Sequence, residues 1–191
     1  VRTKGLRDTV RAMAHLRDLG GVTLTSAGAG EEIEACRAEA ERLGISDRIT
    51  FLGKVPREKV EELYASHDVF CFPSFREPAG GVLYEAMRHG LPIITADRGG
   101  PAWIVDDLSG IKIPVTEPRE FANDIASALR ELATNTEKRL RMGQQAKAKV
   151  EREGLWPVKA AALVSLYKDV IANQLAASPL PKDSVDTTKL V

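Results

Sequence analysis

Short apolar runs alternate along this chain with longer segments of helical periodicity, and this alternation limits the possible folds more than any other feature. Apolar runs of strand length occupy residues 22–26, 49–53, 69–72, 92–95 and 111–113. Helical spacing of apolar residues is found at 5–18, 31–43, 57–66, 81–89, 118–132 and 136–152. Strands separated by helices are typical of a parallel sheet covered by helices on both faces. We therefore expect an α/β fold with a doubly wound, Rossmann-like parallel sheet.

Composition and charge set further limits. The chain has 191 residues, 43% hydrophobic and 28% charged, which is enough for one sizeable core. Its formal net charge is zero, so global charge favours neither a nucleic acid nor an anionic membrane as partner. No apolar stretch approaches the roughly 18 residues that a membrane span needs. Cys36 and Cys71 lack metal-site spacing and are interpreted as reduced, packed thiols of a cytoplasmic protein.

Several glycine-containing segments directly follow the predicted strands. They are Gly28 with Gly30, Gly53, the run from Ser74 to Gly81, and Gly99 with Gly100. In doubly wound folds, ligands bind at the carboxyl ends of the strands, where the strand order reverses. We therefore expect these segments to form a single binding site along one edge of the sheet.

The run from Ser74 to Met87 carries the strongest functional signal. It places Glu77, Gly80, Gly81 and Glu85 around the expected start of a helix. The first N–H groups of a helix are unpaired and electropositive, so a phosphate fits there without a metal, and glycine lets it approach the backbone closely. A carboxylate such as Glu85 can accept hydrogen bonds from two vicinal hydroxyls of a ribose, and Glu77 can do the same for a hexose. The alternative is structural: Glu77 as a charge that favours the helix dipole, and Glu85 as a solvated helix residue.

The wider pattern resembles the C-terminal half of group 1 (family 4) GT-B glycosyltransferases over about residues 1–175. The segments that carry this resemblance are Lys4-Gly5-Leu6, Ser26 to Gly30, Ile49 to Gly53, His67 to Ser74, Glu77 to Glu85, Gly90 to Ile94 and Gly99-Gly100-Pro101. One departure concerns the loop: family members commonly read Glu-Gly-Phe-Gly, whereas this chain reads Glu77-Pro78-Ala79-Gly80-Gly81. The resemblance therefore leaves the sugar open.

The resemblance implies roles for individual residues. Glu77 corresponds to the glutamate that contacts the donor sugar, Glu85 to the one that contacts the ribose, and Lys4 to the diphosphate-binding lysine. We expect Lys4 and Glu77 to be catalytic and no metal or cofactor to be needed. The expected donor-binding residues are Lys4, Gly28, Ser74, Glu77, Ala79, Gly80, Gly81, Val82 and Glu85.

The resemblance also implies a domain organisation. Residues 1–175 form the nucleotide-sugar-binding domain, in which 157–175 is a helix that crosses to an N-terminal GT-B domain, the expected partner. The family places one more strand, central in the sheet, before Val1. Its absence would leave unpaired backbone on both neighbouring strands. Residues 176–191 are rich in proline and small polar residues and are expected to be a disordered tail.

The function implied is a retaining glycosyltransferase that moves a hexose from a nucleotide diphosphate sugar to an acceptor hydroxyl, in polysaccharide or glycolipid synthesis. The isolated domain is expected to bind donor weakly and to turn over little, and the full-length protein to be cytoplasmic, at the inner face of a membrane. The alternatives are a GT-B nucleotide-sugar epimerase and a non-catalytic sugar-nucleotide-binding scaffold. A two-carboxylate glycosidase ranks last, because its mechanism has no role for the glycine loop.

Aromatic and histidine residues give weaker signals. Trp103 and Trp156 can serve as sugar platforms but are interpreted as packing residues. His89 precedes Gly90 and is interpreted as interacting with a helix C-terminus.

Overall fold

The computed structural model describes residues 2–177, which contain five parallel strands arranged in two sheets. In the first sheet β1 pairs with β2, with Leu24 opposite Ile49. In the second, β4 lies between β3 and β5, with Ile93 opposite Phe70 and Gly110. The strands are β1 (Leu24–Ala27), β2 (Ile49–Gly53), β3 (Phe70–Phe72), β4 (Ile93–Ala96) and β5 (Gly110–Ile113).

Helices follow the strands in alternation, as the sequence predicts. They are α1 (Leu6–Ala14), α2 (Glu32–Arg42), α3 (Arg57–Ser66), α4 (Gly81–Arg88), α5 (Gly99–Ile104), α6 (Pro118–Thr134) and α7 (Thr136–Lys149). Short 3₁₀ turns cover Arg2–Lys4 and Ser46–Arg48, and a π-helical turn covers Val150–Gly154. Only α5 is absent from the prediction, because Gly99-Gly100-Pro101 is typical of a loop; proline is nevertheless tolerated in the first turn of a helix.

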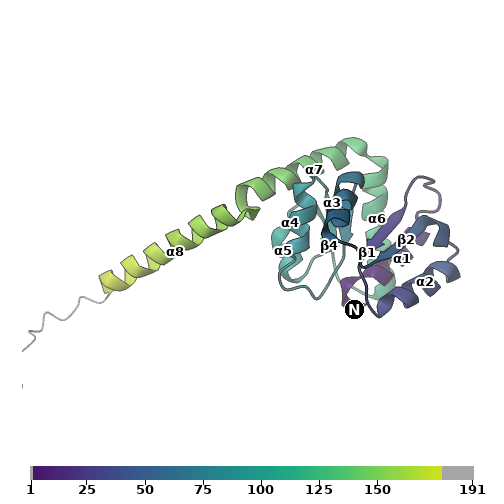
Figure 1. The fold of residues 1–191 in the computed structure, drawn as a ribbon, viewed down its shortest axis with the longest axis horizontal. Coiled ribbons are helices and arrows are strands. Elements are labelled where there is room, and N and C mark those ends of the chain that lie inside the picture. Colours follow the sequence, from purple (N-terminus) through teal and green to yellow (C-terminus); the bar gives the residue numbers. More distant parts are fainter. Residues whose placement is uncertain (1, 178–191) are drawn as a thin grey trace, which may run out of the picture. The chain divides into compact units, whose positions relative to one another are not determined.

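Two hydrophobic clusters lie on the two faces of the strands. One cluster joins both sheets to α1, α2 and α6 and includes Val10, Leu16 and Ile94. The other packs α3, α4 and the α7 region on the opposite face and includes Leu83 and Ile93. Neighbouring residues of β4 thus enter different clusters, which explains its uninterrupted apolar sequence. The α/β class with helices on both faces is confirmed; Figure 1 shows α1 and α2 beside β1 and β2.

The strands form two separate parallel sheets, which agrees with the unpaired strand edges that the sequence analysis expects. Within residues 2–177, β1 has β2 as its only strand partner and β3 has only β4. The two sheets remain in one unit because α1 packs against both α2 and α6. The break falls between β1 and β3, where the family resemblance places a further strand.

The described residues divide into two compact units, the first ending at Glu151 and the second beginning at Arg152. The second contains α8 (Trp156–Ala177), a single long helix that includes the predicted 157–175 helix. Exposed apolar side chains of α8 include Leu163, Tyr167 and Ile171. None of the described helices is long and apolar enough to cross a membrane. Most of the predicted tail, residues 178–191, lies outside the described residues.

Candidate donor site

The start of the chain is fixed against the loop that follows β3. The backbone oxygen of Thr3 accepts hydrogen bonds from the Ser74 hydroxyl and the Phe75 amide, both at 3.1 Å. Gly5 adopts a φ of 77°, and a Cβ there would lie 2.5 Å from the Pro73 oxygen. Only glycine allows this approach. Residues 3–5 and 73–75 therefore form one rigid corner, and Lys4 projects from it.

Lys4 forms an ion pair with Glu77. The second carboxylate oxygen of Glu77, Oε1, accepts a hydrogen bond from the Gly80 amide at 3.2 Å. The Lys4 hydrogen bond, assisted by the Gly80 amide, holds the pKa of Glu77 below its usual range. The Lys4 ammonium also lies 5.5 Å from the ring centroid of Phe72, within cation–π range. Glu77 is thus an ionised carboxylate that joins Lys4 to the start of α4.

The loop from Glu77 to Gly80 is held between α4 and α5. Gly80 caps α4 with a φ of 69°, a left-handed conformation that favours glycine. On the other side, the Gly100 amide donates to the Glu77 backbone oxygen at 2.9 Å. A Cβ at Gly100 would lie 2.5 Å from the Pro78 oxygen. The glycine pair at the start of α5 therefore sets the position of the predicted sugar-binding loop.

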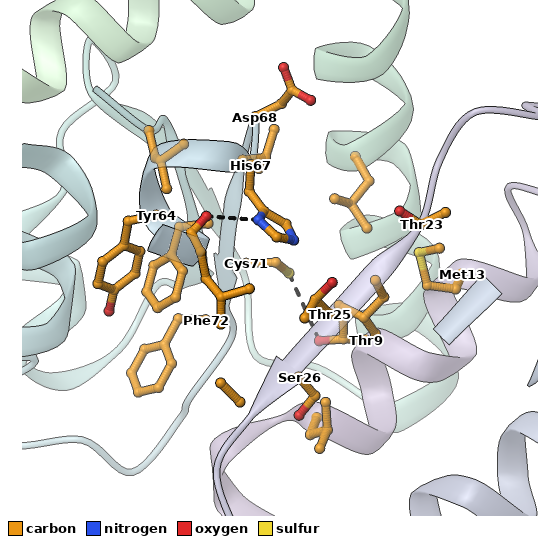
Figure 2. Close-up of a pocket in the computed structure, with 18 of the residues that line it drawn as sticks. Thr9, Met13, Thr23, Thr25, Ser26, Tyr64, His67, Asp68, Cys71 and Phe72 are labelled. Atoms are coloured by element: carbon orange, nitrogen blue, oxygen red, sulfur yellow. Dashed lines mark hydrogen bonds between the residues drawn. The ribbon is translucent and has the colours of Figure 1, made fainter. Parts of the chain in front are cut away.

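Four of the nine predicted donor-binding residues line one large cavity of about 1050 Å³: Lys4, Gly28, Val82 and Glu85. Figure 2 shows this cavity, with side chains from β1 and from β3 pointing into it. Gly28 reaches it from the end of β1, with a φ of 135°. The carboxyl ends of β1 and β3 thus meet at one edge, as expected for ligand binding in this fold class.

The other five predicted residues lie outside the lining of this cavity. Ser74 is fully buried, and its hydroxyl donates a hydrogen bond to the backbone oxygen of Thr3. Glu77 is paired with Lys4, and Ala79, Gly80 and Gly81 continue from it to the start of α4. Their roles in donor binding stay predictions, and for Ser74 the structure provides a role in fixing the corner.

Glu85 lies on α4 near the buried ring of Tyr64. Burial, followed by the charges of Glu85 and Glu61, raises the pKa of Tyr64 to about 12. The phenol therefore stays neutral at physiological pH and keeps its donor proton. Because Glu85 lines the cavity while Glu77 is paired with Lys4, the two carboxylates of the motif have different surroundings.

Other candidate residues have structural roles. His89 pairs with Glu61 at 2.7 Å and links α4 to α3, so its ring contacts a side chain rather than helix carbonyls. Among residues 2–177 no group of three or more His, Cys, Asp or Glu side chains is arranged to hold a metal. The packing interpretation of Trp103 is wrong, because its exposed fraction is 91%. Trp156 belongs to the second unit, and its packing role stays a prediction. Trp103 is exposed because α5 turns its buried face, with Pro101 and Ile104, toward the core.

Sequence reasoning missed the contacts that assemble this corner. The Thr3–Ser74 hydrogen bond and the Lys4–Glu77 ion pair join residues 71 and 73 positions apart. Neither separation corresponds to a local periodicity, so the sequence carries no signal for them. The apolar run predicts Phe72 as a strand residue and gives no sign of its contact with the Lys4 ammonium.

Comparison with known proteins gives the family. The profile of "Glycosyl transferases group 1" matches residues 1–149. D-inositol 3-phosphate glycosyltransferase of Corynebacterium glutamicum is 36% identical over 139 residues, covering 72% of this chain and 32% of that protein. Spore coat protein SA of Bacillus subtilis is 37% identical over 125 residues, covering 64% of this chain and 32% of that protein. The chain thus spans about a third of the length of these relatives.

Solved structures agree with the sequence comparison. HepE of Anabaena, determined in complex with UDP, gives a TM-score of 0.71 at 26% identity, covering 88% of this chain and 46% of HepE. The C-terminal domain of a group 1 glycosyltransferase from Francisella tularensis gives 0.71 at 19% identity, with 82% of each chain covered, and shows the same fold. The resemblance to the C-terminal half of a GT-B fold is therefore confirmed. This chain belongs to the group 1 glycosyltransferase family.

Proposed function

We propose that this chain is the donor-binding domain of a retaining hexosyltransferase that takes a nucleotide diphosphate sugar. The observation that carries the proposal is the arrangement of Lys4, Glu77 and the start of α4 beside a cavity lined by Glu85. The Lys4 cation and the N-terminus of α4 suit a diphosphate. The carboxylates of Glu77 and Glu85 suit the hydroxyls of two sugars.

The proposed chemistry is electrostatic. As the bond from the hexose to the diphosphate breaks, negative charge grows on the departing phosphate oxygens. Lys4 and the amides at the start of α4 would stabilise that charge, which lowers the barrier without a metal. Glu77 would hold hexose hydroxyls and Glu85 the ribose.

The Lys4–Glu77 pair bears directly on donor binding. Because the pair neutralises both groups, an arriving diphosphate competes with Glu77 for the ammonium. Donor binding would then release the Glu77 carboxylate toward the sugar. In this way one lysine would couple diphosphate binding to sugar recognition.

UDP-glucose is the first donor to test. HepE has been determined in complex with UDP, with UDP and glucose, and with UDP-glucose, at 24–26% identity to this chain. We propose that this chain also binds a uracil nucleotide. The hexose has to be determined by experiment, because Pro78-Ala79 differs from the Gly-Phe that is common in the family's loop.

The acceptor site would lie in an N-terminal domain of the full-length protein. The relatives include D-inositol 3-phosphate glycosyltransferases, and a structural neighbour, WaaG, is described as involved in lipopolysaccharide biosynthesis, at 28% identity and a TM-score of 0.70. We propose an acceptor hydroxyl of a polysaccharide or glycolipid, used in the cytoplasm at a membrane surface.

Calorimetric titration with UDP, GDP and ADP, followed by UDP-glucose and UDP-N-acetylglucosamine, tests the proposal. Lys4→Ala and Glu85→Gln are the test variants. Lys147→Ala and Glu58→Gln are matched controls on exposed helix positions of the same unit. We expect UDP to bind best, with affinity at least about tenfold weaker in both test variants and unchanged in both controls. Equal affinity for all three nucleotides, or equal loss in controls and test variants, contradicts the proposal.

A further inference from the structure

The side chain of Tyr64 is buried, yet its hydroxyl has no hydrogen-bond partner among residues 2–177. Tyr64 lies on α3 and is only 6% exposed. Burial and the charges of nearby residues act on its phenol, but no hydrogen bond does. The hydroxyl of a buried tyrosine usually has a partner. The unpaired group on Tyr64 therefore points to a ligand as its partner.

Neighbouring rings hold the Tyr64 side chain in place. Its ring packs edge-on against Phe70, with the ring centroids 5.5 Å apart. It also lies 5.6 Å from the ring of His89, which pairs with Glu61 of α3 at 2.7 Å. The hydroxyl is thus fixed before any ligand arrives, which reduces the entropy cost of binding.

The Tyr64 hydroxyl opens into the cavity of the candidate donor site. Tyr64 lines this cavity together with Val82 and Glu85 of α4. In the part of the chain that the structure describes, only nitrogen atoms of two arginines are both unpartnered and sealed from solvent, so the phenol oxygen is accessible. Figure 2 shows this oxygen pointing toward the end of the cavity where Phe72 and Ser26 lie, at the carboxyl ends of the strands. This is the end at which the donor is proposed to bind.

Two carboxylates act on the phenol, and only one of them is available to share a ligand with it. Both Glu85 and Glu61 raise the pKa of Tyr64, which places both near its ring. Glu61 is occupied, since its Oε2 pairs with His89 and its Oε1 lies 3.6 Å from Arg57. Glu85 has neither a hydrogen bond nor an ion pair within the described residues. Glu85 is therefore the carboxylate that complements the Tyr64 hydroxyl.

The two groups have opposite hydrogen-bonding capacities. The neutral phenol has a proton to donate, whereas an ionised carboxylate can only accept. No hydrogen bond joins Tyr64 to Glu85 directly in the described structure, although both line the same cavity. A ligand hydroxyl between them accepts from the phenol and donates to the carboxylate at the same time. The pair is thus suited to a ligand that carries hydroxyl groups.

We propose that Tyr64 is a further donor-binding residue, whose hydroxyl donates a hydrogen bond to one of the two ribose hydroxyls that bind Glu85. This inference rests on the proposed function, because it takes the nucleotide ribose as the ligand of Glu85. It adds selectivity for a ribonucleotide over a deoxyribonucleotide. A ribose that lacks the shared hydroxyl leaves the phenol and one carboxylate oxygen unpaired in the cavity, and such unpaired groups weaken binding.

Calorimetric titration with three nucleotides tests the inference. UDP, 2′-deoxy-UDP and 3′-deoxy-UDP are each titrated into the parent chain and into two variants. Tyr64→Phe removes the hydroxyl and keeps the ring that packs against Phe70. Tyr167→Phe makes the same chemical change at an exposed position of α8 and is the matched control.

We expect Tyr64→Phe to weaken UDP binding about three- to tenfold, the range for one neutral hydrogen bond, and Tyr167→Phe to leave it unchanged. The loss should disappear with one of the two deoxy nucleotides, because that ligand lacks the hydroxyl that Tyr64 contacts. When Glu85→Gln is already present, Tyr64→Phe should weaken UDP binding less than it does in the parent, since both side chains share one ligand hydroxyl.

Thermal melting without nucleotide separates this role from a structural one. Because the Tyr64 hydroxyl has no partner in the described fold, Tyr64→Phe should melt within about 1 °C of the parent chain. A fall of about 3 °C or more would show that the hydroxyl supports the fold, and this would overturn the inference.

The nucleotide series can overturn the inference in two further ways while the proposed function stands. The first is a parent chain that binds UDP and loses no affinity in Tyr64→Phe. The second is an equal loss of affinity for all three nucleotides in Tyr64→Phe, which would place the effect outside the ribose hydroxyls. A parent chain that binds none of the three overturns the proposed function, and with it the ligand assigned to Tyr64.

Discussion

The ammonium of Lys4 and the carboxylate of Glu77 form an ion pair, although 73 positions separate them in the chain. Lys4 lies in the 3₁₀ turn that precedes α1, and Glu77 lies in the loop that enters α4. The contact therefore joins the two segments that the family resemblance assigns to the diphosphate and to the sugar.

The pKa of Glu77 tests this contact. The Lys4 hydrogen bond lowers it, so the pKa measured by NMR titration of the carboxyl carbon should lie below the ordinary 4.5. Lys4→Met should raise it toward that value, and Lys147→Met should leave it unchanged. Because the folded-state pKa is depressed, the pair contributes stability above about pH 4.5, and this is lost as the pH falls through the folded-state pKa. The contribution is small, at most about 1 kcal/mol, because Lys4 is 47% exposed. An unshifted pKa in the parent protein would contradict the pair.

A substitution at Gly81 should affect donor binding without reducing the stability of the fold. It occupies the first turn of α4, and a Cβ there would meet nothing within 4 Å. Gly81→Ala should therefore keep or raise stability, by up to about 1 kcal/mol, since alanine is the better helix former. If the donor approaches the amides of this turn, the added methyl should weaken UDP-sugar binding at least about tenfold. Thermal melting and calorimetry on the same sample check both parts. An unchanged affinity for the UDP-sugar would show that the start of α4 is not part of the donor site.

Gly100 should behave differently, because its surroundings are closed. A Cβ there would lie 2.5 Å from the Pro78 oxygen, whereas one at Gly20 would meet nothing within 4 Å. Gly100→Ala should destabilise the chain by about 1–3 kcal/mol, and Gly20→Ala by less than about 0.5 kcal/mol. Urea denaturation measures both. Equal stability of the two variants would mean that α5 does not hold the loop at Pro78.

Glu39, which lies outside the candidate donor site, should make the stability of the fold depend on pH. Hydrogen bonds from Arg42 and Arg11 lower the pKa of Glu39 to about 2, and its side chain is 13% exposed. The depressed pKa contributes stability above pH 4.5 that is lost as the pH falls toward about 2. At pH 7, Glu39→Gln should cost about 1–2 kcal/mol, allowing for solvent screening around the exposed Arg42, and the difference from the parent should shrink below pH 4.

Glu34→Gln is the matched control, in the same helix with its carboxylate 87% exposed. It should change stability by less than about 0.5 kcal/mol at either pH. Urea denaturation at pH 7 and near pH 3 makes the comparison. A cost at Glu39 that does not depend on pH would show that packing, not charge, is lost.

Local patterns in the sequence predict most of the elements. The run Val69 to Phe72 predicts β3 because a short apolar segment fits a strand buried on both faces, and Gly80 marks the start of α4 because it tolerates positive φ. The helix α5 was missed because Gly99-Gly100-Pro101 has the composition of a loop; its glycines serve close packing against Glu77 and Pro78. Trp103 is apolar and follows Gly100-Pro101 in a short apolar run, which favours packing; its exposure follows from α5, whose buried residues Pro101 and Ile104 face the core instead.

The α/β class, the order of strands and helices, and the family can all be predicted from the amino-acid sequence, since they follow from local periodicity and from motifs such as Glu77 to Glu85. The ion pair of Lys4 with Glu77 and the hydrogen bond from the Ser74 hydroxyl to the Thr3 oxygen became apparent only in the folded chain, as did the identity of β1 and β3 as the strands with open edges. The physical reason is the separation along the chain over which each interaction acts. Helix and strand periodicity is set by neighbours a few residues apart, whereas ion pairs and strand pairing depend on distances that the whole packed fold creates.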